Sequence, residues 1–137
     1  MVMNKKSLQL PPLITTTTIK AGFPNPAEDA RGNPLDLNQM VVRHPVATFY
    51  LRVEGDSMSG IGLKTGDIVV VDKSLEPRDG DIVIGVVDGE FTLKRLRKKG
   101  QEAYLVAENP SFSPIPLHTA QDASIWGVVT FAIQQYR

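Results

Sequence analysis

DIVIGVVDGEFTLKRL, residues 81–96, holds two apolar runs separated by Asp88-Gly89. Asp and Gly both tolerate the positive φ angles of a two-residue hairpin turn. We therefore predict two antiparallel strands, Asp81–Val87 and Glu90–Leu96, that lie next to each other. This hairpin is the clearest local structural signal in the chain, and it indicates a β-rich fold.

Short runs of the same kind recur from residue 47 onward. They are rich in Val, Ile, Phe and Tyr, and Gly, Pro and Asp separate them. This spacing is typical of an all-β domain. The sequence predicts a β-rich domain over residues 46–137, with four further strands at Ala47–Val53, Asp67–Asp72, Ala103–Ala107 and Ile125–Ile133.

The first 45 residues have a different composition, since they hold six of the ten prolines. Proline removes a backbone donor and fixes φ, which excludes one long helix or a central strand. We predict an extended arm over residues 1–45, and a disordered leader is the alternative. Within it we expect a short helix over Leu35–Val42, with Asp36 as N-cap and Gln39 completing a capping box. Pro45 would prevent its continuation.

Length and composition exclude several classes of protein. The chain has 137 residues, 42% of them hydrophobic, which is enough for one core. Fifteen basic and fifteen acidic residues balance, so no overall basic field indicates nucleic-acid binding. The three basic residues among residues 1–21 have no acidic counterpart there. The absence of cysteine excludes disulfides and thiolate sites.

Membrane and export signals are also missing from the sequence. No apolar run approaches the ~20 residues of a membrane-spanning helix. Pro11-Pro12 interrupts the apolar stretch Leu8–Ile14, which disfavours a secretory leader. We expect a soluble cytoplasmic protein with no cofactor, no metal and no membrane partner.

The two histidines, His44 and His118, lack the spaced ligands of a metal site, and no serine has the G-x-S-x-G context of a nucleophile elbow. We expect both histidines to be solvated or structural. The segment Gly55–Gly60 is more informative, because Ser57 follows a predicted strand and has glycines on both sides. Such a serine suits a nucleophile with a neighbouring N–H as oxyanion donor. The spacing alone favours the alternative, a polar turn in which Asp56 or Ser57 caps a helical turn, because that is the commoner use of such residues.

A serine without a histidine needs another base, and a neutral lysine can serve. Burial lowers a lysine pKa by up to ~3–5 units. Lys94 stands in the middle of a predicted strand, on the same face as Thr92 and Leu96 by the period of two. Two other interpretations stay open: an edge-strand charge that opposes aggregation, or part of a basic patch over residues 94–99 for phosphate or an acidic partner.

Three motifs occur together in one order: Ala21-Gly22, Gly55-Asp56-Ser57-Met58 and residues 91–96, FTLKRL. With about 35 residues between each pair, they resemble the LexA/UmuD family of self-cleaving serine–lysine peptidases, and its UmuD-type members above all. Residues 35–39, 81–84 and 126–129 match as well, so the resemblance runs from residue 21 to the C-terminus.

The resemblance implies a fold and a mechanism. The fold would be that of a LexA C-terminal domain, with curved β-sheets or a barrel, an extended N-terminal arm and one or two short helices. Ser57 would attack the carbonyl of Ala21, and Lys94 would take its proton. The backbone N–H groups of Ser57 and Met58 would form the oxyanion hole, and the bond cleaved would be Ala21–Gly22.

The resemblance also implies partners. UmuD-type members are homodimers that a filament of RecA on single-stranded DNA stimulates to cleave themselves. The product, without residues 1–21, would join a UmuC-type polymerase in error-prone translesion synthesis, with no sequence-specific DNA contact of its own. The alternatives are a non-catalytic β-domain interaction module and a fragment of a LexA-type repressor. Only 21 residues, rich in Thr and Pro, precede the expected cleavage site, which disfavours a repressor.

Overall fold

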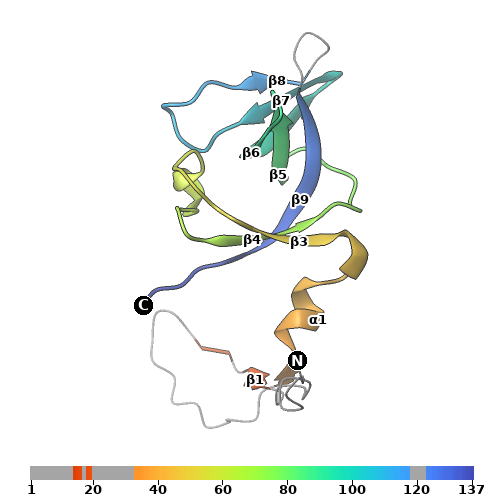
Figure 1. The fold of residues 1–137 in the computed structure, drawn as a ribbon, viewed down its shortest axis with the longest axis vertical. Helices are drawn as coiled ribbons and strands as arrows, with labels where there is room; N and C mark the ends of the chain where they lie inside the picture. The colour runs from red at the N-terminus through yellow and green to blue at the C-terminus, as the bar shows by residue number, and fades with distance from the viewer. Residues whose placement is uncertain (1–13, 17, 20–32, 118–122) are drawn as a thin grey trace, which may run out of the picture. The chain divides into compact units, whose positions relative to one another are not determined.

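The computed structural model describes residues 14–16, 18–19, 33–117 and 123–137 (Figure 1). The chain divides into two compact units, residues 1–40 and 41–137. In the first unit, β1 (Ile14–Thr16) pairs antiparallel with β2 (Asn33–Leu35). The expected cleavage site, Ala21-Gly22, lies outside the described residues.

Helix α1 (Leu37–Val41) begins where the sequence places its cap. The Oδ1 atom of Asp36 accepts hydrogen bonds from the N–H groups of Asn38 and Gln39, at 3.1 and 3.4 Å. The prediction of Asp36 as N-cap is therefore confirmed, because its side chain satisfies donors that a helix start leaves unpaired. The predicted start at Leu35 is wrong, since that residue belongs to β2.

The second unit is built on one antiparallel sheet of seven strands, in the order β3-β4-β9-β5-β6-β7-β8. The mostly β fold is confirmed, and all six predicted strands are present within three residues of their predicted ends. The short strand β8 was not predicted, because a proline and a length of two residues give no strand pattern. The strands are β3 (Thr48–Arg52), β4 (Ile68–Asp72), β5 (Ile82–Val87), β6 (Glu90–Lys99), β7 (Glu102–Val106), β8 (Ile115–Pro116) and β9 (Ala123–Ile133). Two 3-10 turns, η2 (Pro45–Ala47) and η3 (Ser59–Ile61), flank β3.

Strand β9 gives the sheet its curvature. Its first half pairs with β5 and its second half with β4, and the register shifts at Val70/Val71 and Ile84/Gly85. Such irregularities bend a strand and increase its twist. Figure 1 shows the result: the long strand β9 runs from the group β5–β8 to the pair β3–β4. One strand therefore connects two parts of the sheet that face different directions.

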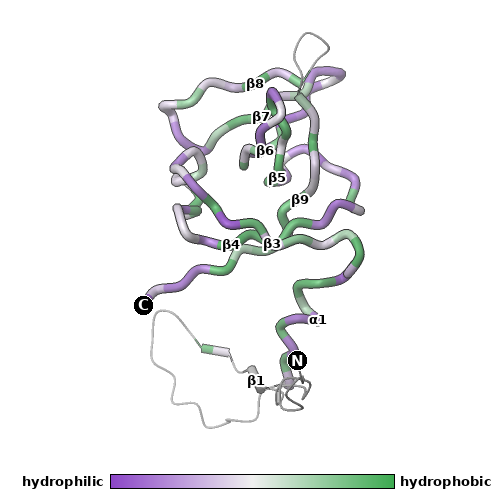
Figure 2. Tube along the Cα trace, in the orientation of Figure 1, coloured by the Kyte–Doolittle hydropathy of each residue, from purple (hydrophilic) through white to green (hydrophobic). Residues whose placement is uncertain are grey.

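Two apolar clusters form the core on either side of this bend, and Figure 2 shows hydrophobic residues concentrated where β3, β4 and β9 meet. The second cluster lies under β5–β7 and consists of Val83, Leu96, Leu105 and Val128. The first cluster contains the loop after β3 as well as the strands. Its buried members are Val53, Met58, Leu63, Val69, Val71 and Ile84.

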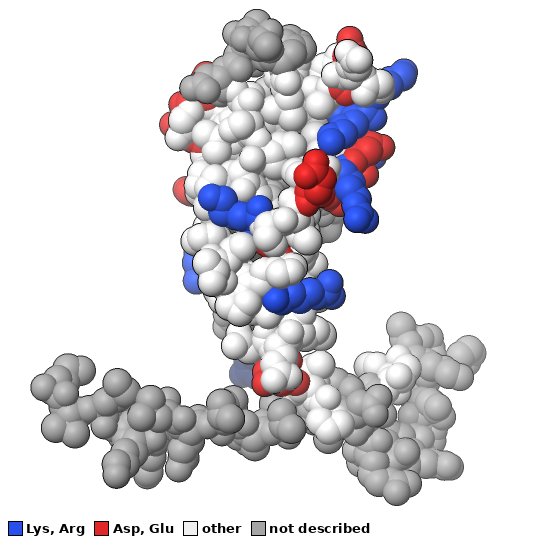
Figure 3. Space-filling view, turned by 90° about the vertical axis from the view of Figure 1, so that its right-hand side faces the viewer, with Lys and Arg blue, Asp and Glu red and all other residues white. Residues whose placement is uncertain are grey.

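Charged side chains of both signs lie next to one another on the face seen in Figure 3. One close pair joins Arg95 of β6 to Glu108. In the part of the chain that the structure describes, no helix has the length and apolar character needed to cross a membrane.

The close packing of β9 against β4 leaves no room for a side chain at Gly127. A Cβ there would lie 2.5 Å from Cγ1 of Val71, a stiff β-branched side chain. We expect Gly127→Ala to lower the free energy of unfolding by about 1–3 kcal/mol, as overpacking does. Urea titration would measure it. The double variant Gly127→Ala/Val71→Ala should lose less stability than the two single changes together, and strict additivity would contradict this explanation.

Candidate active site

Ser57 lies in a loop, residues 53–67, whose two ends are held together. The N–H of Val53 donates to the carbonyl of Asp67 at 2.8 Å, and the N–H of Gly66 donates back to the carbonyl of Val53 at 2.9 Å. Gly55 has a φ of +99°, which turns the chain after β3. Met58 is only 1% exposed and belongs to the first core cluster. The residue after Ser57 is therefore anchored in the core, which fixes the position of the serine.

Lys94 lies on β6, which pairs with β5 on one side and β7 on the other. Its exposed fraction is 6%. The interpretation as an edge-strand charge is therefore wrong, because β6 is a central strand. Membership in a solvated basic patch is wrong as well, because the side chain is buried. The predicted face is correct: Leu96 is buried and Thr92 half-buried beside it.

The side chains of Ser57, in the loop of residues 53–67, and Lys94, on β6, are in hydrogen-bond contact. The Nζ atom of Lys94 lies 3.1 Å from Oγ of Ser57, 2.8 Å from Oγ1 of Thr92 and 3.3 Å from the carbonyl oxygen of Leu93. The Ser57 hydroxyl donates to that same carbonyl at 3.2 Å. An ammonium group has three donors, and these three acceptors satisfy them. The polar turn alone does not describe this serine, because its hydroxyl faces β6.

The surroundings of Lys94 favour its neutral form. Burial removes water from the ammonium, and this desolvation lowers the pKa of Lys94 from its ordinary value. Within the described residues no carboxylate forms an ion pair with it. The ring of Phe112 lies 5.6 Å from Nζ and provides only a weak cation–π contact. The site therefore holds a lysine that gives up its proton more easily than one in water.

The expected oxyanion donors are the N–H groups of Ser57 and Met58. Among the described residues, neither group donates a hydrogen bond to the protein. The carbonyl of Met58, by contrast, is hydrogen-bonded: it accepts from the N–H groups of Ile61 and Leu63. The two N–H groups are therefore not engaged by the described residues around them. Their role as an oxyanion hole stays a prediction, as do the roles of Ser57 and Lys94.

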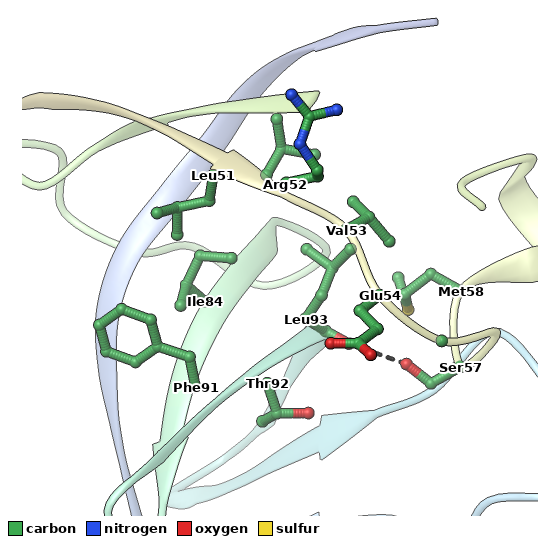
Figure 4. A pocket seen from close by; sticks show the side chains of 12 residues that line it. Leu51, Arg52, Val53, Glu54, Ser57, Met58, Ile84, Phe91, Thr92 and Leu93 are labelled. Atoms are coloured by element: carbon green, nitrogen blue, oxygen red, sulfur yellow. Dashed lines mark hydrogen bonds between the residues drawn. The ribbon is translucent and has the colours of Figure 1, made fainter. Parts of the chain in front are cut away.

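A groove of about 420 Å³ begins at the serine and runs between β3 and β6. Figure 4 shows Ser57 and Met58 at one end and Phe91 at the other, with Leu51 and Ile84 between them. Its lining combines apolar side chains with the polar side chains of Arg52, Glu54, Ser57 and Thr92, and residues at the end of β3 border it. The lining residues are Leu51–Gly55, Ser57, Met58, Val69, Ile84 and 91–93. Such a groove suits an extended peptide with apolar side chains.

His44 has a structural contact away from this site. Its Nδ1 atom lies 2.6 Å from Oδ2 of Asp72, and the other oxygen of that carboxylate accepts from Ser74. His118 lies outside the described residues. In the ranges 33–117 and 123–137, no group of three or more histidine or carboxylate side chains could hold a metal ion.

Sequence reasoning missed the segment after β7, which contacts the serine loop. The N–H of Gly60 donates to the carbonyl of Glu108 at 2.7 Å, and Nδ2 of Asn109 donates to the carbonyl of Asp56 at 2.9 Å. The pair Asn109-Pro110 gives only a turn signal in the sequence. That signal indicates the turn, but it does not indicate what the turn packs against.

Known proteins resemble this chain over most of its length. Residues 12–130 match the model of the family described as Peptidase S24-like. The chain is 47% identical over 122 residues to Protein SamA of Salmonella typhimurium strain LT2, which covers 89% of this chain and 84% of SamA. It is 43% identical to Protein ImpA of Escherichia coli, covering 86% and 80% of the two chains, and 39% identical to Protein MucA of Escherichia coli, covering 86% and 81%. The chain therefore belongs to the Peptidase S24-like family, which confirms its resemblance to the LexA/UmuD family of serine peptidases.

Proposed function

We propose that this protein is a serine–lysine peptidase that cleaves its own chain between Ala21 and Gly22. One observation carries the proposal: the buried Nζ of Lys94 lies 3.1 Å from Oγ of Ser57 and has no described carboxylate as ion-pair partner. A lysine with only a structural role would destabilise the fold at this position, because burying a charge without an ion-pair partner is unfavourable. A catalytic base benefits from the same burial, because a lowered pKa makes the lone pair of the amine available closer to neutral pH.

The first step needs the neutral amine. When Lys94 loses a proton, its lone pair can accept the hydrogen of the Ser57 hydroxyl, which at rest points to the carbonyl of Leu93. Oγ then forms a bond to the carbonyl carbon of Ala21 while its proton passes to Nζ. The negative charge moves to the carbonyl oxygen, where the N–H groups of Ser57 and Met58 stabilise it.

The tetrahedral intermediate then collapses. The bond between Ala21 and Gly22 breaks, and the Lys94 ammonium gives its proton to the leaving amine of Gly22. An ester joins Ala21 to Ser57. Lys94, neutral again, takes a proton from water, which attacks the ester and releases the Ala21 carboxylate and the free serine. One water is consumed, and the products are residues 1–21 and residues 22–137.

The arm, proposed as residues 1–45, supplies the substrate of the reaction. β3 is the strand at one edge of the sheet in the order of the described strands. An extended segment can add to such an edge, with the groove receiving its side chains. Because the peptide is tethered to the domain, its effective concentration is high, and a modest nucleophile is sufficient.

The resemblance to UmuD-type members supports a role beyond cleavage. In this proposal a filament of RecA on single-stranded DNA stabilises the docked arm and shifts the population toward the cleavable state. The shortened chain, as a homodimer in the cytoplasm, then serves a UmuC-type polymerase as accessory subunit in error-prone synthesis past DNA damage. Mixing purified uncleaved and cleaved chains with such a polymerase tests this: binding should favour the cleaved form.

Replacement of either dyad residue should stop cleavage. We expect Ser57→Ala and Lys94→Ala to abolish the product that begins at Gly22, because one removes the nucleophile and the other its base. Mass spectrometry and N-terminal sequencing after incubation at alkaline pH would measure it. Lys98→Ala, which removes a lysine from the exposed end of the same strand, should cleave normally. A product starting at Gly22 in either dyad variant would refute the mechanism.

Cleavage should accelerate with rising pH. The neutral fraction of Lys94 grows as the pH rises through its folded-state pKa, which burial holds below the ordinary value, and the rate then levels off. Thr92→Val removes an acceptor of the ammonium, so it should move the midpoint to lower pH. The rate constant of self-cleavage, measured across the alkaline range, gives both midpoints. A pH-independent wild-type rate would exclude Lys94 as the base.

The buried lysine should also reduce stability. Its pKa is lower in the folded than in the unfolded chain, so the unfolded chain binds the extra proton. Stability therefore rises with pH between the two pKa values, and the penalty is complete below the folded one. We expect Lys94→Met to raise the free energy of unfolding by about 1–2 kcal/mol at neutral pH. Urea titrations should show this gain shrinking as the pH approaches the ordinary lysine pKa, and a gain that grows with pH would contradict it.

A further inference from the structure

Asn109 contacts the residue that precedes the candidate nucleophile. It lies just after β7, and its Nδ2 atom donates to the carbonyl oxygen of Asp56 at 2.9 Å. Its other amide atom, Oδ1, accepts from the N–H of Ser111 at 3.0 Å. Because the acceptor end of the amide is held by Ser111, the donor end must face Asp56. The orientation of this side chain is therefore set from both ends.

The carbonyl of Asp56 and the N–H of Ser57 belong to one peptide group. That group is planar and trans, so the carbonyl and the N–H point in opposite directions. A donor that holds the carbonyl therefore also sets the direction of the Ser57 N–H. The same hydrogen bond polarises the peptide group and makes its N–H a stronger donor.

The serine loop and the segment of Glu108 and Asn109 are packed so closely that neither can shift far relative to the other. The N–H of Gly60 donates to the carbonyl of Glu108 at 2.7 Å, and a Cβ at position 60 would lie only 2.4 Å from that oxygen. The segment of Glu108 and Asn109 thus holds the loop at residue 56 and at residue 60, on either side of Ser57. The carbonyl of Asp56 also accepts from the N–H of Ser59, at 3.1 Å.

We propose that Asn109 is a positioning residue for the oxyanion hole: its hydrogen bond to the Asp56 carbonyl directs the Ser57 N–H toward the developing oxyanion. The inference rests on the proposed function of Ser57. A purely structural role of Asn109 would lie in the turn that follows it, where its side chain accepts from Ser111 and its carbonyl from Phe112. Nδ2 also lies 3.5 Å from Oγ of Ser59, a longer contact than the one to the Asp56 carbonyl. The two roles use the donor and the acceptor end of the side chain, and variants can therefore separate them.

Asn109→Asp is the decisive variant. Its carboxylate keeps the acceptor for the N–H of Ser111 and the size of the side chain, but it removes the donor to the Asp56 carbonyl. Loss of a direct oxyanion donor lowers rates about 10²–10³-fold. In this variant the oxyanion donor, the Ser57 N–H, is still present but is no longer held in the right direction. We therefore expect the plateau rate of alkaline self-cleavage of the full chain to fall by about 10-fold or more.

The pH profile separates this effect from a change in Lys94. The added carboxylate can raise the pKa of Lys94 and so move the midpoint upward, but it cannot by this route lower the plateau, where the lysine is neutral in every variant. Asn109→Ala, the second variant, adds no charge and should lower the plateau without moving the midpoint. Gln101→Glu, in the exposed turn between β6 and β7, adds the same charge without this contact and should keep the wild-type plateau.

A second readout does not depend on docking of the arm. A small alkyl fluorophosphonate reacts with an activated serine: a bond forms between Oγ and phosphorus, the hydroxyl proton passes to Nζ of Lys94, and the bond from phosphorus to fluorine breaks so that fluoride leaves. The phosphoryl oxygen occupies the oxyanion position. We expect Asn109→Asp to slow this labelling of Ser57 by a factor similar to that of self-cleavage. Thermal unfolding of each variant, followed by circular dichroism, verifies that the chain is folded at the assay temperature.

Wild-type plateau and labelling rates in both folded Asn109 variants would overturn the inference and leave the proposed function intact. Slower self-cleavage with unchanged labelling would also overturn it, because Asn109 would then act on the arm and not on the oxyanion hole. A wild-type chain that neither cleaves itself nor labels at Ser57 would overturn the proposed function, and the inference with it.

Discussion

The hydrogen bond between Nζ of Lys94 and Oγ of Ser57 joins residues that are 37 positions apart in the chain. Their meeting depends on the curvature of the sheet, because Ser57 follows β3 at one end of the strand order and β6 is the fifth strand of that order, four strands away. A flat sheet of this order would hold the two residues about four strand spacings apart, at roughly 4.8 Å each. The bend in β9 is therefore a condition for the site as well as for the core.

Burial of the lysine has two opposite effects. It weakens the fold, because an ammonium without a carboxylate loses its hydration. The same loss of hydration favours the neutral amine, which the proposed mechanism uses as a base. The surrounding apolar cluster, with Met58 and Val69 each 1% exposed, supplies the stability that such a group requires. The candidate nucleophile Ser57 is followed directly by Met58, a buried residue of the core, so the packing that stabilises the fold also holds the serine in place.

Local patterns predicted the strands well, and non-local packing accounts for what they missed. The Asp88-Gly89 turn and the runs of Val and Ile specify neighbouring strands through short-range geometry. The burial of Lys94 was left open from the residues alone, because it depends on β6 being covered by β5, β7 and the serine loop together. Asn109 was missed for the same reason: its turn is local, whereas its contact with Asp56 spans 53 positions.

The order of the strands has a consequence for synthesis of the protein. The serine loop joins β3 to β4, and Lys94 lies in the hairpin of β5 and β6. In the strand order, β9 lies between these two pairs of strands and is what connects them. β9 is made after all the other strands of the sheet. A nascent chain can therefore fold both hairpins before it can bring their reactive groups into register. If the chain cleaves itself as proposed, the pairing of β9 with both hairpins is required before Ser57 and Lys94 can meet, so self-cleavage would wait until β9 has been made.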